Sequence, residues 1–253
     1  MSLFDTDAFN RALFYPQPIT SPAPAGAEDV RVGPERLHLR IYGPPSRAVL
    51  LLFHGNGEVV ADYDELAPRY AEKVGVSLAV MDYRGYGQSG GVPTLRSAIA
   101  DAQPVLDAVI GRGLPVIVMG RSLGGALAAE LCKVERPEVK GFVFESAPSN
   151  LEGIVARRGI RDKPTLEDRA VFDPLPKMAR CKTPALVMHG EEDALISIDE
   201  AVQTMSALPN GRLVRIPGRG HNDVSEHPLY WEALGEFVQA RFRRRSSYGP
   251  AAP

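Results

Sequence analysis

The amino-acid sequence predicts an α/β fold with a mostly parallel central sheet and helices on both of its faces. Short runs recur that are apolar at nearly every position, which is typical of strands buried on both faces in a parallel sheet. The runs cover residues 48–53, 77–81, 116–119, 141–144 and 185–188. Segments with apolar residues at helical spacing lie between them. This alternation of strand and helix predicts a doubly wound sheet.

Two further elements are predicted from polar residues. Over residues 37–41, apolar residues alternate with His38 and Arg40, which predicts an outer strand with one polar face. Ser197 and Glu200 have the spacing of a capping box, in which each side chain accepts a hydrogen bond from a backbone N–H at the start of a helix. We therefore expect a helix to begin at this pair.

The length and the single strand-and-helix pattern predict one domain over residues 1–253. The pattern breaks over residues 147–181, which are rich in arginine and proline and too many for an ordinary loop. We expect this segment to form a short inserted cap or flap. A last helix is expected from about residue 228 to residue 243, and residues 246–253 are expected to be a flexible tail.

Composition and charge exclude several classes of partner. The 29 basic and 31 acidic side chains give a net charge of -2, which offers no positive field for nucleic acid. No apolar stretch approaches the roughly 18 residues of a membrane span, and the first residues lack the positive charge of a secretory signal. The two cysteines form no paired motif, so no metal site is expected. We expect a soluble, cytoplasmic protein.

The pattern GxSxG occurs twice, around Ser89 and around Ser122. A nucleophilic serine of this type lies on a sharp turn between a strand and a helix, where small neighbours allow a strained backbone. Ser122 follows the buried run 116–119 and precedes a strong helix-forming segment, 126–134. Ser89 is followed by two glycines, valine and proline, so we expect it to lie in a loop. Ser122 is the predicted nucleophile.

A nucleophilic serine needs a base, and histidine is the usual base at neutral pH. His221 lies in a glycine-rich loop after the predicted strand 212–216, where it is free to turn toward the serine. The other histidines adjoin predicted strands or a helix start and are interpreted as structural: His38, His54, His189 and His227. His221 is therefore the predicted base.

An acidic residue must hold the histidine in the right orientation and stabilise its protonated form. Asp193 follows the buried run near residue 188, and the order Ser122, Asp193, His221 is one that serine hydrolases use. Glu145 and Asp223 are the alternative acids.

The oxyanion of a tetrahedral intermediate needs hydrogen-bond donors. We expect one from the backbone N–H of Leu123 and one from that of Asn56, in the loop after residues 48–53. Gly55 and Gly57 allow this loop to approach closely.

Five segments carry a resemblance to a known family. They are FHGNGE (53–58), DYRGYGQSGG (82–91), GRSLGG (120–125), HGEEDALI (189–196) and PGRGHND (217–223). In this order they resemble the α/β-hydrolase superfamily, and within it compact intracellular serine hydrolases similar to Bem46, ABHD13 and ABHD17. The resemblance implies the α/β-hydrolase fold, a triad of Ser122, Asp193 and His221, and oxyanion donors at Asn56 and Leu123. The 147–181 insert matches no cap of this family.

These observations predict a cofactor-free serine hydrolase that cleaves carboxylic esters or thioesters of a small molecule through an acyl-enzyme on Ser122. A peptidase or an acyltransferase would use the same residues. A non-catalytic binding protein of the same fold is a further alternative and would normally show a broken triad. A nucleotide-binding oxidoreductase is supported only by GxGxxG at residues 85–90, and the helix expected inside that motif is absent from the pattern.

The insert leaves one question of specificity open. Arg157, Arg158 and Arg161 lie in a segment that leaves the sheet near the carboxyl ends of the strands, where α/β active sites open. They either cover the acyl pocket and bind an anionic substrate or form a charged surface flap. The second alternative is favoured, with Glu152, Asp162, Glu167 or Asp168 as the partners of these arginines.

Overall fold

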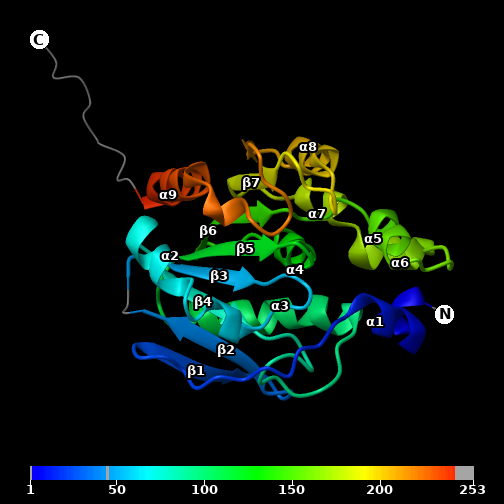
Figure 1. Ribbon diagram of the computed structural model, residues 1–253, viewed down its shortest axis with the longest axis horizontal. Helices are drawn as coiled ribbons and strands as arrows, with labels where there is room; N and C mark the ends of the chain where they lie inside the picture. The colour runs from blue at the N-terminus through cyan, green and yellow to red at the C-terminus, as the bar shows by residue number, and fades with distance from the viewer. Residues whose placement is uncertain (1, 44–45, 243–253) are drawn as a thin grey trace, which may run out of the picture.

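The computed structural model describes residues 2–43 and 46–242, and its strands form a single eight-stranded sheet (Figure 1). The strands are β1 (Ala27–Val32), β2 (Leu37–Tyr42), β3 (Val49–Phe53), β4 (Ser77–Met81), β5 (Val116–Arg121), β6 (Val139–Glu145), β7 (Ala185–Gly190) and β8 (Gly211–Ile216). Their order is β1-β2-β4-β3-β5-β6-β7-β8, and all neighbours from β4 to β8 are parallel. The predicted fold class is confirmed.

Helices cover both faces of the sheet. They are α1 (Asp7–Leu13), α2 (Ala67–Lys73), α3 (Leu95–Ile110), α4 (Gly124–Leu131), α5 (Leu151–Arg157), α6 (Leu166–Phe172), α7 (Pro174–Met178), α8 (Ile198–Ala207) and α9 (Pro228–Phe242). Short 3-10 turns cover Leu3–Asp5, Val60–Tyr63 and Val224–Glu226. Alternate residues of β5 point to opposite faces: Val118 packs in the core with α3, α4 and α8, and Met119 packs with α2 and α9. The two-sided burial explains why the strands read as continuous apolar runs.

The prediction of an outer strand at residues 37–41 is wrong. β1 lies outside β2 and pairs with it in antiparallel orientation, so β2 is an inner strand. His38 and Arg40, expected on a polar face, are 1% and 0% exposed. Polar side chains alternate with apolar ones in the same way whether they face water or buried partners, and here they face buried partners.

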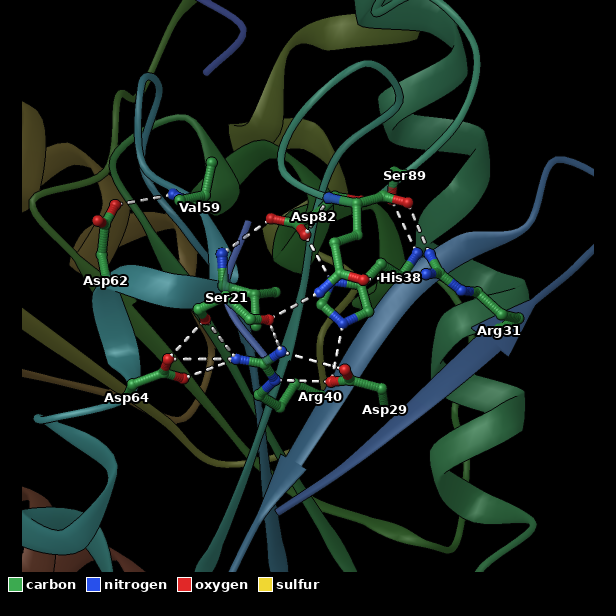
Figure 2. A network of polar contacts seen from close by, with 12 residues as sticks. Ser21, Asp29, Arg31, His38, Arg40, Val59, Asp62, Asp64, Asp82 and Ser89 are labelled. Carbon is green, nitrogen blue, oxygen red and sulfur yellow. Dashed lines mark hydrogen bonds and ion pairs between the residues drawn. The ribbon is translucent and has the colours of Figure 1, made fainter. Parts of the chain in front are cut away.

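Those partners form a network of charges at the β1 and β2 side of the sheet (Figure 2). Arg40 donates from Nε to Asp29 at 2.6 Å and from Nη1 to Asp64 at 2.9 Å. His38 lies 2.9 Å from Asp29 through Nε2 and 2.6 Å from Asp82 through Nδ1. The carboxylates balance the charge of an arginine that has no access to water, and breaking such a pair is costly. The network therefore fixes β1 against β2 and the loops after β3 and β4.

The capping box predicted at Ser197 and Glu200 is also wrong, although α8 does begin at the next residue, Ile198. The Ser197 side chain makes no capping hydrogen bond. The buried Glu200 carboxylate instead accepts from the Ser149 N–H at 2.9 Å and pairs with Arg157 at 2.7 Å. Partners from a distant segment have drawn the carboxylate away from the helix end.

The inserted segment contains α5, α6 and α7 and contacts the N-terminal segment (Figure 1). Asp168, which forms the capping box of α6 with Thr165, accepts from the Ser2 hydroxyl at 2.6 Å and from the Leu3 N–H at 3.0 Å. The rings of Phe4 and Phe172 meet edge to face, with centroids 6.2 Å apart. The N-terminal segment is thus part of the cover that was expected from the insert alone. The tail predicted at 246–253 lies outside the described residues.

Stability should fall in acid partly through Asp29. Partial burial raises the pKa of Asp29, but hydrogen bonds from Arg40 and His38 outweigh this effect and lower the pKa from 3.8 to about 2. Its stabilisation is therefore complete above about pH 4 and is lost as pH falls toward 2. Asp29→Asn should reduce the free energy of unfolding at pH 7 by about 2 kcal/mol and flatten its decline between pH 4 and 2.

Urea unfolding at a series of pH values measures both effects. Glu28→Gln is the matched control, since Glu28 is the exposed neighbour on β1 and should matter by less than about 0.5 kcal/mol. Equal acid slopes for the wild type and the Asp29 variant would contradict this assignment.

Candidate active site

The predicted site residues lie on loops at one edge of the sheet. Parallel strands present their carboxyl ends at the same edge, where α/β proteins bind ligands. The loops after β3, β5, β7 and β8 carry Asn56, Ser122, Asp193 and His221. The structure thus brings together four loops that are separated in sequence.

Ser122 lies on a sharp turn between β5 and α4. Its φ is 50°, in the left-handed region that only a constrained L residue adopts. Its N–H donates to the carbonyl of Glu145 at 2.9 Å, which holds the turn against the end of β6. The flanking glycines are required sterically, because a Cβ at Gly124 would overlap the carbonyl oxygen of Phe53 and one at Gly120 would overlap that of Gly124.

His221 connects the serine to an acid. Its Nε2 lies 2.9 Å from Ser122 Oγ, and its Nδ1 lies 2.8 Å from Asp193 Oδ2. An ionised carboxylate only accepts hydrogen bonds, so Nδ1 carries the proton and Nε2 accepts from the serine hydroxyl. The orientation is the one in which the histidine can remove the serine proton.

Asp193 is held in its ionised form. Burial raises the pKa of Asp193, but hydrogen bonds from His189, His221 and the Ile196 N–H outweigh this effect and hold the pKa well below its ordinary value. Two backbone N–H groups, of Leu195 and Ile196, donate to Oδ1 at 2.9 and 2.8 Å. His189, interpreted from sequence as structural, supports the acid from the strand below it at 3.3 Å.

The alternative acids point elsewhere. Glu145 accepts from the Tyr230 hydroxyl at 2.7 Å and pairs with Arg121 at 3.2 Å. Asp223 accepts from the Gly220 N–H at 2.7 Å, a contact that shapes the loop carrying the histidine. Neither carboxylate is bonded to His221 in the described part of the chain.

The remaining histidines have structural contacts. His54 Nδ1 lies 2.7 Å from the Gly55 carbonyl, and His227 accepts from the Leu229 N–H at 3.1 Å. His38 belongs to the charge network of Figure 2.

Asn56 and Leu123 border the same pocket as Ser122. Within the described residues, neither of their backbone N–H groups donates to a protein acceptor. The Asn56 side chain is held firmly, because Oδ1 accepts from the Tyr86 hydroxyl at 2.7 Å and Nδ2 donates to the Leu13 carbonyl at 2.5 Å. Two fixed, unused donors beside a nucleophile are what an oxyanion requires.

Arg121, which sequence reasoning did not single out, connects the loops of the site. It pairs with Glu58 and with Glu145, and its Nη2 donates to Asn222 Oδ1 at 2.9 Å. Glu58 in turn accepts from the Gly55 N–H at 2.9 Å. One guanidinium therefore joins the serine turn, the Asn56 loop and the histidine loop. The available signal was its position inside GxSxG, beside the predicted nucleophile.

The glycine-rich motif at 85–90 and the second GxSxG serine belong to one loop between β4 and α3. Gly87 has a φ of 46°, and a Cβ there would overlap the Asp82 carboxylate. Ser89 Oγ accepts from the His38 N–H at 2.8 Å and donates to the Asp82 carbonyl at 2.7 Å. Since α3 begins only at Leu95, the motif lacks the helix start that a dinucleotide needs. Both features serve the buried network.

The pocket beside Ser122 has a volume of about 70 Å³. Its walls are Leu13, Asn56, Ser122, Leu123, Pro148, Ile154, Arg157, Arg158, Leu195 and Ile196. The sequence did not predict that Leu13 lines this pocket. Nothing in a short N-terminal helix indicates that its end lies beside the loop that carries Ser122.

The structure answers the question about the three insert arginines only in part. Arg157 and Arg158 line the pocket, and Arg161 does not. The partner of Arg157 is Glu200 of α8, none of the four acids expected for a surface flap.

Two kinds of feature are absent from residues 2–43 and 46–242. No cluster of three or more His, Cys, Asp or Glu side chains has the arrangement of a metal site. No helix in the same ranges has the length and apolar character needed to cross a bilayer.

Gly124→Ala should destabilise the protein through backbone overlap. The added Cβ has no space beside the Phe53 carbonyl, so β3 or α4 must shift, and we expect a loss of about 3 kcal/mol or more in the free energy of unfolding. Gly111→Ala is the matched control at the end of α3, where the new Cβ meets only ordinary contacts at 3.4 and 3.5 Å. It should change stability by less than about 1 kcal/mol. Similar urea midpoints for the two variants would show that the turn has more room than described.

Several known proteins are similar to this chain in sequence. The family model described as serine aminopeptidase, S33, matches residues 44–159. The α/β hydrolase domain-containing protein aho-3 of Caenorhabditis elegans is 28% identical over 200 residues, covering 77% of this chain and 58% of that protein. The human α/β hydrolase domain-containing protein 17C is 28% identical over 208 residues, covering 77% and 59%. The alignments thus span about three fifths of these relatives.

Solved structures agree in fold. An esterase from Pyrococcus furiosus has a TM-score of 0.73 at 19% identity, over 91% of this chain and 98% of that one. A thermophilic esterase from Thermogutta terrifontis has a TM-score of 0.65 at 17% identity, over 85% and 100%. Fold, motif order and relatives agree: the chain has the α/β-hydrolase fold, and its relatives support membership of the α/β-hydrolase superfamily.

Proposed function

We propose that the protein is a serine hydrolase that cleaves carboxylic esters or thioesters through an acyl-enzyme on Ser122. The observation that carries the proposal is the hydrogen-bond chain from Ser122 Oγ through His221 to Asp193, at 2.9 and 2.8 Å. The serine end of this hydrogen-bond chain lines a pocket that Asn56 and Leu123 also border. The backbone N–H groups of these two residues have no acceptor among the described residues. A binding protein would have no need of this alignment.

In the first half of the reaction, His221 Nε2 takes the Ser122 proton while Oγ attacks the substrate carbonyl carbon. The carbonyl oxygen becomes an oxyanion and accepts from the N–H groups of Asn56 and Leu123, each worth about 10² to 10³ in rate. Asp193 stabilises the protonated histidine. The imidazolium then donates its proton to the departing oxygen or sulfur, and the acyl group remains on the serine.

In the second half, water takes the place of the alcohol or thiol. His221 removes a proton from water, the resulting hydroxide attacks the acyl carbon, and the same two N–H groups bind the second oxyanion. When this intermediate collapses, the proton returns to Ser122 Oγ and the carboxylic acid leaves. No redox step or cofactor enters this scheme.

The matching family model suggests aminopeptidase activity as a second candidate. An aminopeptidase must bind the positive amino group at the end of its substrate, which requires a nearby acid or an equivalent set of acceptors. None of the described pocket residues is acidic, and two are arginines. The charge of the pocket therefore favours an ester without a free amino group.

Ser122→Ala should abolish both turnover of p-nitrophenyl acetate and covalent labelling by a fluorophosphonate probe, because the nucleophile is removed. Mass spectrometry of labelled wild-type protein should place the adduct on Ser122. Ser89→Ala is the control, since this serine belongs to the other GxSxG and contacts only the buried network. It should still be labelled. An adduct on Ser89, or labelling of the Ser122 variant, would refute the assignment.

Asp193→Asn should lower kcat for p-nitrophenyl acetate by about 10⁴, the loss that the corresponding change causes in a serine protease, because an amide cannot stabilise the protonated histidine. Asp223→Asn keeps an oxygen acceptor for the Gly220 N–H and should lower kcat by less than about tenfold. A near-normal Asp193 variant beside an inactive Asp223 variant would transfer the role of the acid.

A further inference from the structure

The pocket beside Ser122 combines apolar walls with positive charge. Leu13, Ile154, Leu195 and Ile196 supply apolar surface, and Arg157 and Arg158 supply two guanidinium groups. No carboxylate is among its described lining residues. Such a pocket disfavours a purely apolar acyl chain. The acyl chain would displace water from the two guanidinium groups and could not replace the hydrogen bonds that this water accepts.

Arg158 carries a charge that no carboxylate balances in the part of the chain that the structure describes. Its Nη1 donates to the Tyr15 hydroxyl at 2.6 Å, and the guanidinium lies 4.6 Å from the centre of the Tyr15 ring. The Tyr15 N–H bonds the Tyr86 hydroxyl at 2.8 Å and Asn56 Oδ1 at 3.3 Å. Tyr15 of the N-terminal segment thereby holds the guanidinium next to the loop that carries Asn56. The other N–H groups of the guanidinium remain available as hydrogen-bond donors.

Arg157 differs from Arg158 in its charge balance. Glu200 neutralises it through Nη1 at 2.7 Å. Its Nη2 atom is buried and has no hydrogen-bond partner among the residues that the structure describes. A buried donor without a partner is costly, so a ligand acceptor that reached this atom would gain a full hydrogen bond. The two arginines thus offer one free charge and one free donor.

We propose that Arg158, assisted by Arg157 Nη2, binds a carboxylate of the substrate, so that the preferred substrates are short esters that carry a carboxylate a few bonds from the ester carbonyl. This inference rests on the proposed function and specifies its substrate class. A guanidinium and a carboxylate form charge-assisted hydrogen bonds, which apolar walls strengthen by excluding water. The carboxylate does not react. The bond between the acyl carbon and the ester oxygen breaks, and water supplies the hydroxyl of the released acid and the proton of the released alcohol.

Two pairs of esters of matched size test the proposal. Monoethyl glutarate and ethyl glutaramate place a carboxylate or a neutral amide on the acyl side. Acetoxyacetate and acetoxyacetamide place the same groups on the alcohol side. Acid release in a pH-stat gives kcat/KM for each, and the ratio of anionic to neutral ester is the measured quantity. We expect a ratio of about 10 to 100 in one of the pairs, and that pair identifies the side that contacts the arginines.

Arg158→Gln should reduce this ratio to about 1, because the anionic ester loses its charge-assisted hydrogen bonds and therefore more kcat/KM than the neutral ester. Arg161→Gln is the matched control: it removes a charge from the same insert, outside the pocket, and should leave the ratio unchanged. High salt should lower the wild-type ratio. A ratio near 1 in both pairs, or an equal loss on both esters in the Arg158 variant, would overturn the proposal.

A binding measurement separates this proposal from the proposed function. Calorimetry on the Ser122→Ala variant requires no turnover, so the esters themselves serve as ligands, and we expect the anionic ester to bind more tightly than the neutral ester in one of the two pairs. Adding Arg158→Gln should remove the difference. Equal binding within both pairs would refute the anion subsite even if ester hydrolysis is established. Preferential binding of an anionic ester by a protein that no fluorophosphonate labels would instead refute the proposed function and leave the subsite.

Discussion

The left-handed turn at Ser122 is the constraint on which the geometry of the site depends. β5 ends and α4 begins within three residues, so the helix start lies directly against the end of β3. The contact with β3 leaves no room for a side chain at position 124, and the tight turn itself leaves none at position 120. Leu123 lies at the positive, N-terminal end of the helix, next to Ser122. A strained backbone angle thus places Ser122 and Leu123 together at the pocket that Asn56 also borders.

Electrostatic contacts hold the loops around this turn. Arg121 is 13% exposed and lies between Glu58 and Glu145, whose side chains are 24% and 4% exposed. Loops that carry catalytic groups have few buried apolar contacts of their own, so partly buried ion pairs and their hydrogen bonds restrict their motion. Donors that are fixed before substrate arrives stabilise a transition state without the cost of reorganising. Arg121, the cation next to Ser122, is therefore a link between loops, and its charge is balanced by the two glutamates.

The sequence was informative where burial or covalent order determines structure. The inner strands were predicted because both faces are covered, and the loops that follow strands indicated where Ser122, Asp193 and His221 lie. β1 was not predicted, because AEDVRV is charged and pairs with a neighbour on one side only. The network of Figure 2 was beyond sequence reasoning because the partners of Arg40 are up to 24 residues away and no period connects them.

The cover of the pocket was the hardest part to predict, and it has a physical consequence. Arg158 and Tyr15 are 143 residues apart, and Ser2 and Asp168 are 166 apart, yet each pair bonds directly. The N-terminal segment and the insert therefore form one cover, while the triad is built on the sheet. Substitutions in the cover can change the charge and shape of the pocket without strain at the serine turn. Under the proposed function, specificity and reactivity therefore reside in separate parts of the fold, which explains how the same motifs in order can accompany an insert that matches no familiar cap.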